Sequence, residues 1–486
     1  MSGPHFDLSS AAAAEMLREG FDPNFPPGSE KQVAAIRAAL QAPPDPALID
    51  LRQLPWSSID NDSSRDLDQI EVADRVNGGI RVRIGIADVS QSVDAGSPID
   101  EHAAGQTLTV YTASRNFSML PTELSTGLTS LNENQDRAAV VVEFQINGTG
   151  SLECTKIYRA LVHNKAQLAY SKTGPWLEGS AAPDAKVAAA PVLQQQLRLQ
   201  DEAAQALRAQ RVRLGALEFH RVEAEAEVSD GKVLSLRSSE RNRATDLIED
   251  FMIAANEVMA RTLKAAKRSC IRRVVKSPER WSRIVDLASH LGASLPSDPD
   301  SAALNLFLQQ QRARYPMRYP DLSLAVIKLM GPGEYILSKG QDENQPGHFG
   351  LAALDYTHST APNRRFADLV TQRVVKALLA GAPPPYTDDQ LAAIAQHCTE
   401  RESAARKVER AMQKRVAALA LAGSIGRSFH GIITGASEKG VYVRVFNPPV
   451  EGRIVRGEER LDVGDAVEVT LLHTDPRHAF IDFAHP

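Results

Sequence analysis

The stretch SIDNDSSRDLDQI, residues 58–70, places four aspartates beside a single arginine: Asp60, Asp62, Asp66 and Asp68. Like charges repel unless a cation lies between them, so this stretch is either a solvated acidic loop or a site for a divalent metal. The residues that follow, IEVADRVNGGIRV, alternate in polarity with the period of a β-strand. We therefore expect the acidic stretch to lead into a sheet.

A calcium-binding EF-hand is one alternative. Its ligand positions match Asp60, Asp62, Ser64, Asp66, Asp68 and Glu71. However, the EF-hand loop needs a glycine where this chain has Arg65, and it needs flanking helices where this chain has Pro55 and a strand pattern. The EF-hand is therefore rejected.

A magnesium site suits the stretch better. In an extended segment Asp66 and Asp68, two residues apart, point to one face, and Asp60 folds back across the turn. Magnesium binds a few carboxylates together with waters and phosphate oxygens. Hydrolysis of a phosphodiester needs such help, because two cations about 4 Å apart activate water and hold the leaving oxygen.

The composition is typical of a globular enzyme. The 486 residues are enough for roughly two or three domains. No stretch approaches a membrane span, and the opening MSGPHFDLSS lacks a secretion signal, so we expect a cytoplasmic protein. Cys154, Cys270 and Cys398 are more than a hundred residues apart, which argues against a disulfide framework or a thiolate zinc site.

The net charge of −5 conceals a segregation of sign. Between residues 261 and 283 nine Lys or Arg accompany Glu279 alone, and between 401 and 427 seven accompany two glutamates. Acidic side chains near residue 60 could hold a metal ion, and the basic side chains elsewhere could bind a polyanion around it. Either basic run, taken alone, is equally compatible with a solvated helix face.

The chain divides into three parts. Residues 1–48 contain helical patterns at 9–19 and 29–41, which form either a helix-turn-helix contact device or a packing unit. Residues 49–424 show a sheet region over 50–170 and then helical patterns at 191–213, 240–268, 278–292, 301–314, 363–380, 387–398 and 400–423. Strands followed by helices predict an α+β domain.

Residues 425–486 form the third part. Five short strands punctuated by Gly and Pro predict a small OB-fold β-barrel. Phe429 and Tyr442 lie on its early strands, where such barrels present rings for base stacking. A lone aromatic residue on a strand is more often part of the core.

Several motifs in a fixed order identify a resemblance. The stretch Ser58-Ile59-Asp60 with RDLDQ (65–69) is followed by TVYTASRNFSMLPTELSTGLTSLN (109–132), GALEF (215–219), IEDFMIAANEVMAR (248–261), HFGLA (348–352) and YTHSTAPNRRFADLVTQR (356–373). Together they resemble the ribonuclease II (RNB) family of exoribonucleases over about residues 50 to 420. The tail is similar to the OB-fold RNA-binding domain, of the ribosomal S-one type, that closes these enzymes.

The resemblance implies roles for the acidic stretch. Asp60 and Asp66 would help to hold magnesium, and Asp68 would be the carboxylate without which cleavage stops. The family has a fourth aspartate where this chain has Gln69. An amide oxygen can bind a hard cation but adds no charge, which puts the tightness of the site or its second metal in question.

Two nearby acids offer compensation for Gln69. They are Asp62 and Glu71, and their spacing alone does not choose between them.

An arginine pair follows Pro362, which predicts that a helix begins near Asn363. Arg364 and Arg365 would then lie in its first turn, where the helix dipole disfavours cations. A bound phosphate would offset that cost. The resemblance assigns Arg364 to the charge on the transferred phosphoryl group and Arg365 to RNA binding. A simple ion pair of Arg364 with Asp368 is the alternative.

The resemblance also assigns RNA contacts elsewhere. Tyr111 and Phe219 match two aromatic positions that sandwich the bases at the RNA 3′ end, and such stacking ignores sequence. Glu249 and Glu409 match polar positions around the terminal nucleotide, with a solvated helix face as the alternative for each. His348 is expected to be structural.

We therefore expect a magnesium-dependent hydrolytic exoribonuclease that degrades single-stranded RNA processively from the 3′ end to nucleoside 5′-monophosphates. We expect a monomer without a nucleotide cofactor or membrane contact. The alternative is a non-catalytic RNA-binding protein that has lost turnover through Gln69. Family members commonly carry two cold-shock domains before the catalytic region, and residues 1–48 are too few for one, so we expect an open RNA entry path.

Overall fold

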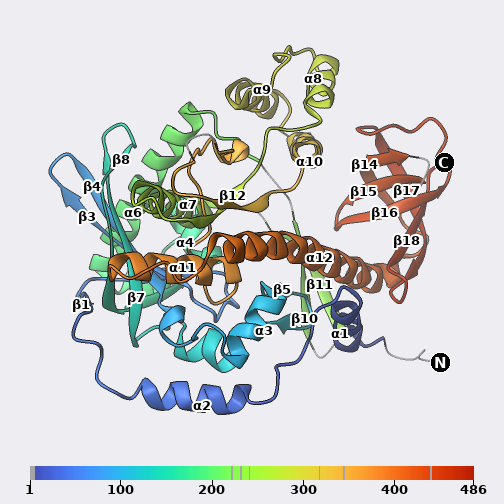
Figure 1. Ribbon diagram of the computed structural model, residues 1–486. Helices are drawn as coiled ribbons and strands as arrows, with labels where there is room; N and C mark the ends of the chain where they lie inside the picture. Colours follow the sequence, from blue (N-terminus) through green and yellow to red (C-terminus); the bar gives the residue numbers. More distant parts are fainter. Residues whose placement is uncertain are drawn as a thin grey trace.

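The computed structural model describes residues 6–219, 223–229, 232–239, 241–316, 318–342, 345–437 and 440–486. A large body of sheet and helices makes up most of the molecule. A small barrel of C-terminal strands stands at the far end of one long helix, α12 (Asp388–Leu421) (Figure 1). This arrangement confirms the predicted fold class, an α+β domain followed by a barrel.

A seven-stranded mixed sheet forms the centre of the large body, in the order β1-β8-β7-β4-β3-β2-β9. Its strands are β1 (Ile49–Asp50), β2 (Ser57–Asp60), β3 (Gln69–Val76), β4 (Gly79–Ala87), β7 (Asp136–Asn147), β8 (Leu152–His163) and β9 (Ala166–Ala169). The turn between β3 and β4 is Asn77-Gly78, with Gly78 at φ +88°. Glycine suits this tight turn because it adopts positive φ without steric cost.

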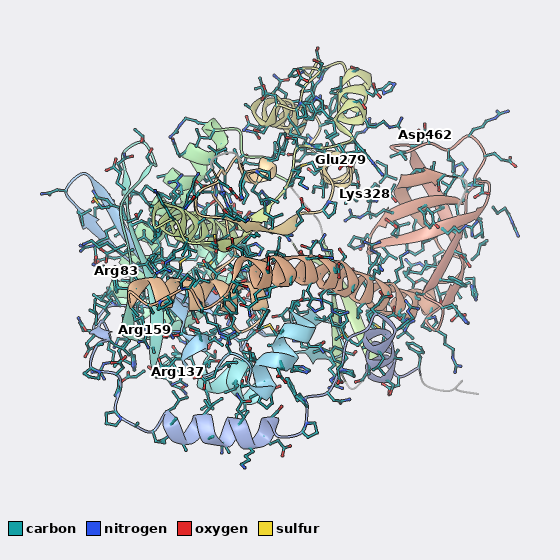
Figure 2. All side chains as sticks on the ribbon, in the orientation of Figure 1. Arg83, Arg137, Arg159, Glu279, Lys328 and Asp462 are labelled. Carbon is teal, nitrogen blue, oxygen red and sulfur yellow. The ribbon has the colours of Figure 1, made fainter. Side chains whose placement is uncertain are left out.

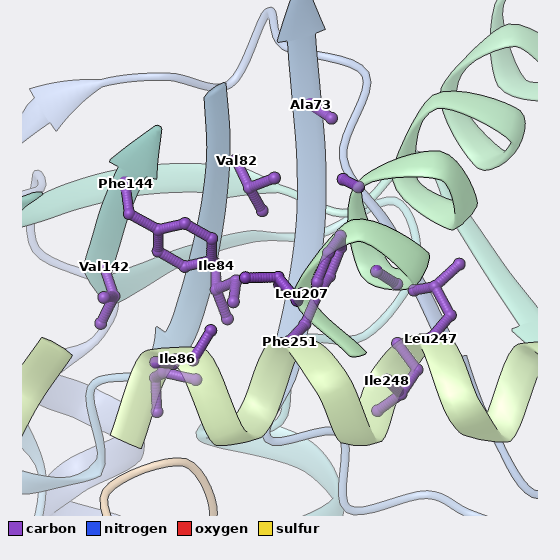
Figure 3. Close-up of a cluster of buried hydrophobic side chains, with 14 of the residues drawn as sticks. Ala73, Val82, Ile84, Ile86, Val142, Phe144, Leu207, Leu247, Ile248 and Phe251 are labelled. Atoms are coloured by element: carbon purple, nitrogen blue, oxygen red, sulfur yellow. The ribbon is translucent and has the colours of Figure 1, made fainter. Parts of the chain in front are cut away.

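Helices cover both faces of the sheet. On one face, β4 and β7 pack against α6 (Pro191–Arg213) and α7 (Arg243–Ala265). Figure 3 shows Leu207 of α6 and Phe251 of α7 beside Ile84 of β4. On the other face the cluster includes residues of α2 (Ser29–Ala39), α3 (Pro98–Gln106) and α11 (Phe366–Leu379). The acidic loop therefore lies at the end of strands that are held from both sides.

Partly buried ion pairs cross the sheet. Arg83 of β4 lies 2.7 Å from Glu143 of β7, and Arg159 of β8 lies 3.1 Å from the buried Asp88. Both arginines lie at the end of the molecule away from the barrel (Figure 2). These cations belong to the fold, because their charge is already balanced by the protein.

The two N-terminal helices pack in different places. Leu8 and Met16 of α1 (Leu8–Arg18) join a cluster with Met412 of α12. Val33 and Ile36 of α2 join the cluster beneath the sheet. In Figure 1, α1 lies near the barrel end of α12, and α2 lies along the bottom of the large body, farther from the barrel. Each helix thus packs on the large body, an arrangement unlike a compact helix-turn-helix.

Three helical predictions differ from the structure. The patterns at 387–398 and 400–423 form one helix, α12, because no Gly or Pro lies between them. The helix predicted from residue 363 begins at Phe366 as α11. The prediction matches α9 (Ser301–Arg314), but it missed α3 within the sheet region, α4 (Tyr170–Leu177), α5 (Ala185–Ala188) and α10 (Tyr319–Met330).

Smaller elements complete the large body. The short helices are α4 (Tyr170–Leu177), α5 (Ala185–Ala188) and α8 (Trp281–His290), and the two-stranded sheets pair β5 (Val110–Tyr111) with β6 (Asn116–Phe117), β10 (Glu223–Ser229) with β11 (Lys232–Ser239), and β12 (Cys270–Val274) with β13 (Glu334–Ser338). Within the ranges that the structure describes, no helix is long and apolar enough to cross a membrane.

The C-terminal strands close into a five-stranded barrel in the order β14-β15-β16-β18-β17. The strands are β14 (Ser428–Ser437), β15 (Gly440–Phe446), β16 (Pro449–Arg456), β17 (Ala466–Asp475) and β18 (Phe480–Ala484). Phe429 is half-buried with its ring 6.1 Å from that of Phe483, and Tyr442 is half-buried beside Gly435. Ala418 and Leu421 of α12 join the barrel core, so helix and barrel are packed together.

Candidate active site

The acidic stretch is the loop between β2 and β3, which are neighbours in the sheet. Flanking strands confirm the rejection of an EF-hand. Asp60 Oδ1 accepts hydrogen bonds from the backbone N–H of Asn61 at 2.7 Å and from Ser64 Oγ at 3.0 Å. Burial raises the pKa of Asp60, and Asp66 adds to that rise. The turn thus holds two carboxylates near each other.

Asp68 is fully buried and pairs with Arg364. Its Oδ2 accepts a hydrogen bond from Arg364 Nε at 3.1 Å, and its Oδ1 accepts one from the backbone N–H of Asn363 at 2.9 Å. Burial raises the pKa of Asp68 to about 7, and the guanidinium opposes the rise. The pair joins the acidic loop to the segment before α11.

Arg364 brings the predicted carboxylates together. Burial lowers the pKa of its guanidinium, but Asp68, Tyr111, Asp60 and Asp66 outweigh burial and raise it. The arginine side chain remains 43% exposed. Among the described residues, no hydrogen-bond partner is found for Nη1 or Nη2, so these two nitrogens are free to bind an anion.

The segment before α11 holds Arg364 through buried partners. Asn256 of α7 accepts hydrogen bonds from both N and Oγ of Ser359, each at 2.8 Å. Thr129 Oγ1 donates to Asn363 Oδ1 at 2.5 Å. The backbone N–H that Asn363 offers to Asp68 is therefore fixed by residues from two distant segments.

Arg365 has a different partner from Arg364. Its Nη2 lies 2.8 Å from Oδ1 of the fully buried Asp368. The alternative in which Arg364 pairs with Asp368 is wrong, because α11 begins at Phe366 and Arg365 is its N-cap residue. The late helix start turns the two neighbouring arginines toward different acids.

Tyr111 lies beside the acidic loop. Its hydroxyl donates to Asp66 Oδ2 at 2.9 Å, and its backbone N–H donates to Glu409 Oε1 at 3.4 Å. Tyr111 is 39% exposed. Burial raises the pKa of both its hydroxyl and the Glu409 carboxyl. The structure thus brings Tyr111, Glu409 and Asp66 into one place.

Phe219 and Glu249 are held by contacts within the fold. Phe219 is half-buried beside the cluster of α8, α9 and α10 that contains Trp281. Glu249 of α7 forms an ion pair with Arg241 and lies 4.0 Å from Arg208. Contact of either residue with RNA stays a prediction.

Gln69 and Glu71 share one face of β3, because they lie two residues apart in a strand. They are opposite Ile86 and Ile84 of β4, which belong to the cluster under α6 and α7. Glu71 is fully buried, and burial together with Asp60 raises its pKa.

Tyr170 was missed by the sequence analysis. Burial raises the pKa of its hydroxyl, and the charges of Asp60 and Glu71 add to the rise while Arg364 opposes it. The ring therefore lies among the active-site charges. A single tyrosine at the start of α4 carries no sequence pattern that could have indicated this. Asn363 was quoted within a motif, but only the structure gives it a partner.

The carboxylates suit a hard divalent cation. Asp60 Oδ2 and Asp66 Oδ1 have no hydrogen-bond partner within the described ranges. In the same ranges no group of three or more His, Cys, Asp or Glu side chains is placed to hold a metal by itself. Magnesium fits such an open arrangement, because it takes one or two carboxylates together with waters and substrate oxygens.

The basic run at 261–283 is largely neutralised in the structure. Arg272 lies 2.6 Å from Asp355, Arg273 lies 2.6 Å from Glu402, and Lys276 lies 2.6 Å from Glu334. Lys264 and Arg261 also have acidic partners. Much of the local positive charge therefore serves the fold.

Two family models match the chain. The model described as RNB domain matches residues 48–381, and the model described as RNase II-type exonuclease C-terminal S1 domain matches residues 427–485. Ribonuclease R 1 of Lactococcus lactis is 29% identical over 420 residues, and Ribonuclease R of Escherichia coli is 28% identical over 447 residues. These matches cover 84% and 88% of this chain but 50% and 54% of the relatives. The chain thus spans about half the length of these curated relatives.

Solved structures share the fold. Mycoplasma genitalium RNase R in complex with ribose methylated single-stranded RNA matches with a TM-score of 0.87 and 22% identity, over 100% of this chain and 79% of that chain. Yeast Ssd1, described as a pseudonuclease, matches with a TM-score of 0.71 and 15% identity, over 96% of this chain and 58% of that chain. Because both a nuclease and a pseudonuclease have this fold, the residues of the site must decide whether catalysis is possible.

Proposed function

Because this chain belongs to the RNB domain family, we propose that it is a hydrolytic 3′-5′ exoribonuclease. It binds single-stranded RNA, cleaves the last phosphodiester linkage and releases nucleoside 5′-monophosphates processively, with magnesium as cofactor. The observation that carries the proposal is the half-exposed guanidinium of Arg364, anchored by the buried Asp68 and surrounded by Asp60 and Asp66. The Arg364 guanidinium can bind a phosphate group, while the carboxylates of Asp60 and Asp66 bind the magnesium that neutralises the same phosphate.

Asp60 and Asp66 would hold the magnesium, with the amide oxygen of Gln69 as a neutral ligand. A bound magnesium supplies activation of water and stabilisation of the leaving oxygen. The chain orients its own ligands, since Ser64 binds one oxygen of Asp60 and Tyr111 binds one oxygen of Asp66. Each carboxylate keeps its second oxygen for the cation.

Arg364 would bind the scissile phosphate. Its Nε is bonded to Asp68, which sets the plane of the guanidinium. Its two outer nitrogens then donate to oxygens on which charge develops during cleavage, the arrangement for which arginine is preferred over lysine. Arg365 is paired with the buried Asp368. Its contribution to RNA binding would therefore be indirect.

The RNA would be held by stacking and polar contacts. Tyr111, which is 39% exposed and bonded to Asp66, would stack on the terminal base, with Phe219 on the other side of the bases. Stacking contributes about 1–3 kcal/mol per base and tolerates any sequence. Glu249 and Glu409 would contact the terminal nucleotide.

The barrel would bind RNA upstream of the active site. Its candidate stacking residues, Phe429 and Tyr442, are both half-buried, which leaves part of each ring available to a base.

The test is incubation of uniformly labelled single-stranded RNA of mixed sequence with the full chain, in magnesium or in a chelator. The proposal expects mononucleotides in magnesium while full-length RNA remains, and no cleavage with chelator. Binding without mononucleotide release would establish the alternative, a non-catalytic RNA-binding protein, which the replacement of an aspartate by Gln69 makes worth testing. A ladder of internal fragments would indicate an endonuclease.

A further inference from the structure

Glu71 is a fully buried acid of β3. Within the described ranges both of its carboxylate oxygens lack a hydrogen-bond partner, and the residue is 0% exposed. A buried carboxyl group without partners is strongly unfavourable unless something binds it. The position therefore calls for a ligand that the described chain does not supply.

Other unsatisfied oxygens lie next to Glu71. Ser57 is its cross-strand partner on β2, and the Ser57 hydroxyl is buried without a partner among the described residues. Gln200 of α6 donates through Nε2 to the backbone oxygen of Glu71 at 3.4 Å, and its own Oε1 is buried without a partner in that part of the chain. Oxygen atoms of this kind suit a hydrated hard cation.

Asp62, the other acid near Gln69 in sequence, is placed differently. It is exposed, and its Oδ1 accepts a hydrogen bond from Ser171 Oγ at 2.9 Å. Because Asp62 is exposed, its charge does not need a cation to balance the cost of burial. Glu71, in contrast, shares the face of β3 with Gln69, and its cross-strand partner Ser57 belongs to β2, the strand that ends at Asp60.

We propose that Glu71 supplies the carboxylate that Gln69 lacks, as an oxygen ligand of the divalent cation held at Asp60. Gln69 contributes a neutral amide oxygen. Glu71, two positions later on the same face of β3, supplies the negative charge. Ser57 and Gln200 hold the waters of the cation. This inference rests on the proposed function, because it concerns the same metal site.

The first test is Glu71→Gln, which keeps the size of the side chain and removes its charge. Titration calorimetry of the RNA-free full chain measures the affinity for Mg²⁺. We expect binding at least about tenfold weaker, the effect typical of removing a group that supports a metal. The matched control Asp62→Asn removes a nearby exposed acid and should leave Mg²⁺ affinity unchanged. Wild-type affinity in Glu71→Gln would overturn the proposal.

The double variant Gln69→Asp with Glu71→Gln moves the acid back to the position that it occupies in the family. We expect it to recover Mg²⁺ affinity to within about threefold of the wild type, since position 69 then supplies the carboxylate that the site needs beside Asp60. A folded double variant that binds Mg²⁺ as weakly as Glu71→Gln alone would overturn the proposal.

Crystals of the wild-type chain soaked in Mn²⁺ give a readout that does not depend on the folding of any variant. An anomalous peak within about 2.5 Å of a Glu71 oxygen supports the proposal. A peak at Asp60 that leaves Glu71 uncoordinated, or no peak at Glu71, overturns it.

Mononucleotide release by the wild type separates this inference from the proposed function. If the wild type releases mononucleotides and Glu71→Gln binds Mg²⁺ normally, the inference fails and the function stands. If Mn²⁺ contacts Glu71 but the wild type releases no mononucleotides, the function fails and the metal ligand stands.

Discussion

Arg364 and Asp68 form an ion pair, with Nε and Oδ2 3.1 Å apart, between residues separated by 296 positions in the sequence. The aspartate is fully buried, whereas 43% of the arginine side chain is exposed. Asp68 thus anchors the guanidinium from the buried side. The outer nitrogens of Arg364 remain available to a phosphate on the exposed side. Cleavage would depend on both residues, for different reasons.

Replacement of Asp68 by asparagine tests the anchor. Asp68→Asn removes the charge that holds Arg364, so we expect mononucleotide release to fall at least about a hundredfold. Single-turnover cleavage measures this, and fluorescence anisotropy should show that RNA still binds. A rate near that of the wild type would mean that the anchor is not needed.

Arg364→Lys tests the fork of nitrogen donors. Lysine keeps the charge but loses the planar pair of outer nitrogens, and we expect a rate reduction of about tenfold to a hundredfold. Arg65→Lys is the matched control, because Arg65 is an exposed arginine in the same acidic stretch. Equal effects of the two replacements would contradict a specific role for Arg364.

Tyr111 has two separable parts. Tyr111→Phe removes the hydroxyl that donates to Asp66 at 2.9 Å, so it should weaken Mg²⁺ binding but keep RNA stacking. Tyr111→Ala also removes the ring and should weaken binding of the RNA end by about 1–3 kcal/mol. The length of the shortest product on a sequencing gel should then increase.

The control for Tyr111 is Tyr315→Ala, since Tyr315 is also an exposed tyrosine, 41% accessible, at the end of α9. It should leave the product length unchanged. A longer product from both alanine variants would point to a general effect on folding.

Asp368→Asn should destabilise the fold. Asp368 is 0% exposed and balances Arg365, and breaking such a pair leaves a partly buried charge without a partner, at a cost of about 2–4 kcal/mol. Urea unfolding followed by circular dichroism measures the loss in free energy of unfolding. Glu202→Gln breaks the exposed pair with Arg75 and should change that free energy by less than about 1 kcal/mol.

The buried His348 should make the stability of the fold sensitive to acid. Burial lowers its pKa from 6.5 to about 4, so between these values the unfolded chain binds a proton that the folded chain does not. The free energy of unfolding therefore rises with pH across this window. The contribution of His348 to that free energy is lost as the pH falls.

His348→Asn keeps an acceptor for the backbone N–H of Leu351, which His348 Nδ1 receives at 3.2 Å. It should reduce the pH dependence between pH 4 and 6.5 by about 1–3 kcal/mol. Chemical unfolding of both proteins at several pH values, without metal, makes the comparison. Parallel curves would rule out His348 as the responsible group.

Much of the fold could be predicted from the sequence. The alternation over residues 50–170 predicts the sheet, and the spacing of apolar residues predicts α6 and α9 with their observed bounds. These features depend on residues that are neighbours in the chain. Periodicity and turn chemistry act over a few residues, so a linear reading detects them.

The acidic stretch and the arginine pair also stand out in the sequence as candidate functional residues. Their partners do not. Only the tertiary structure shows that Arg364 meets Asp68 while Arg365 meets Asp368, because the choice depends on where α11 starts and on which loop lies opposite.

The same limit applies to charge and burial. The sequence shows a basic run at 261–283, but acids from distant segments neutralise much of it, among them Asp355 and Glu402. It shows Asp62 and Glu71 as similar neighbours of Gln69, but one is solvated and the other is enclosed between the sheet and two helices. Composition and spacing belong to the chain itself, whereas electrostatic balance and desolvation depend on which distant segments share the same space.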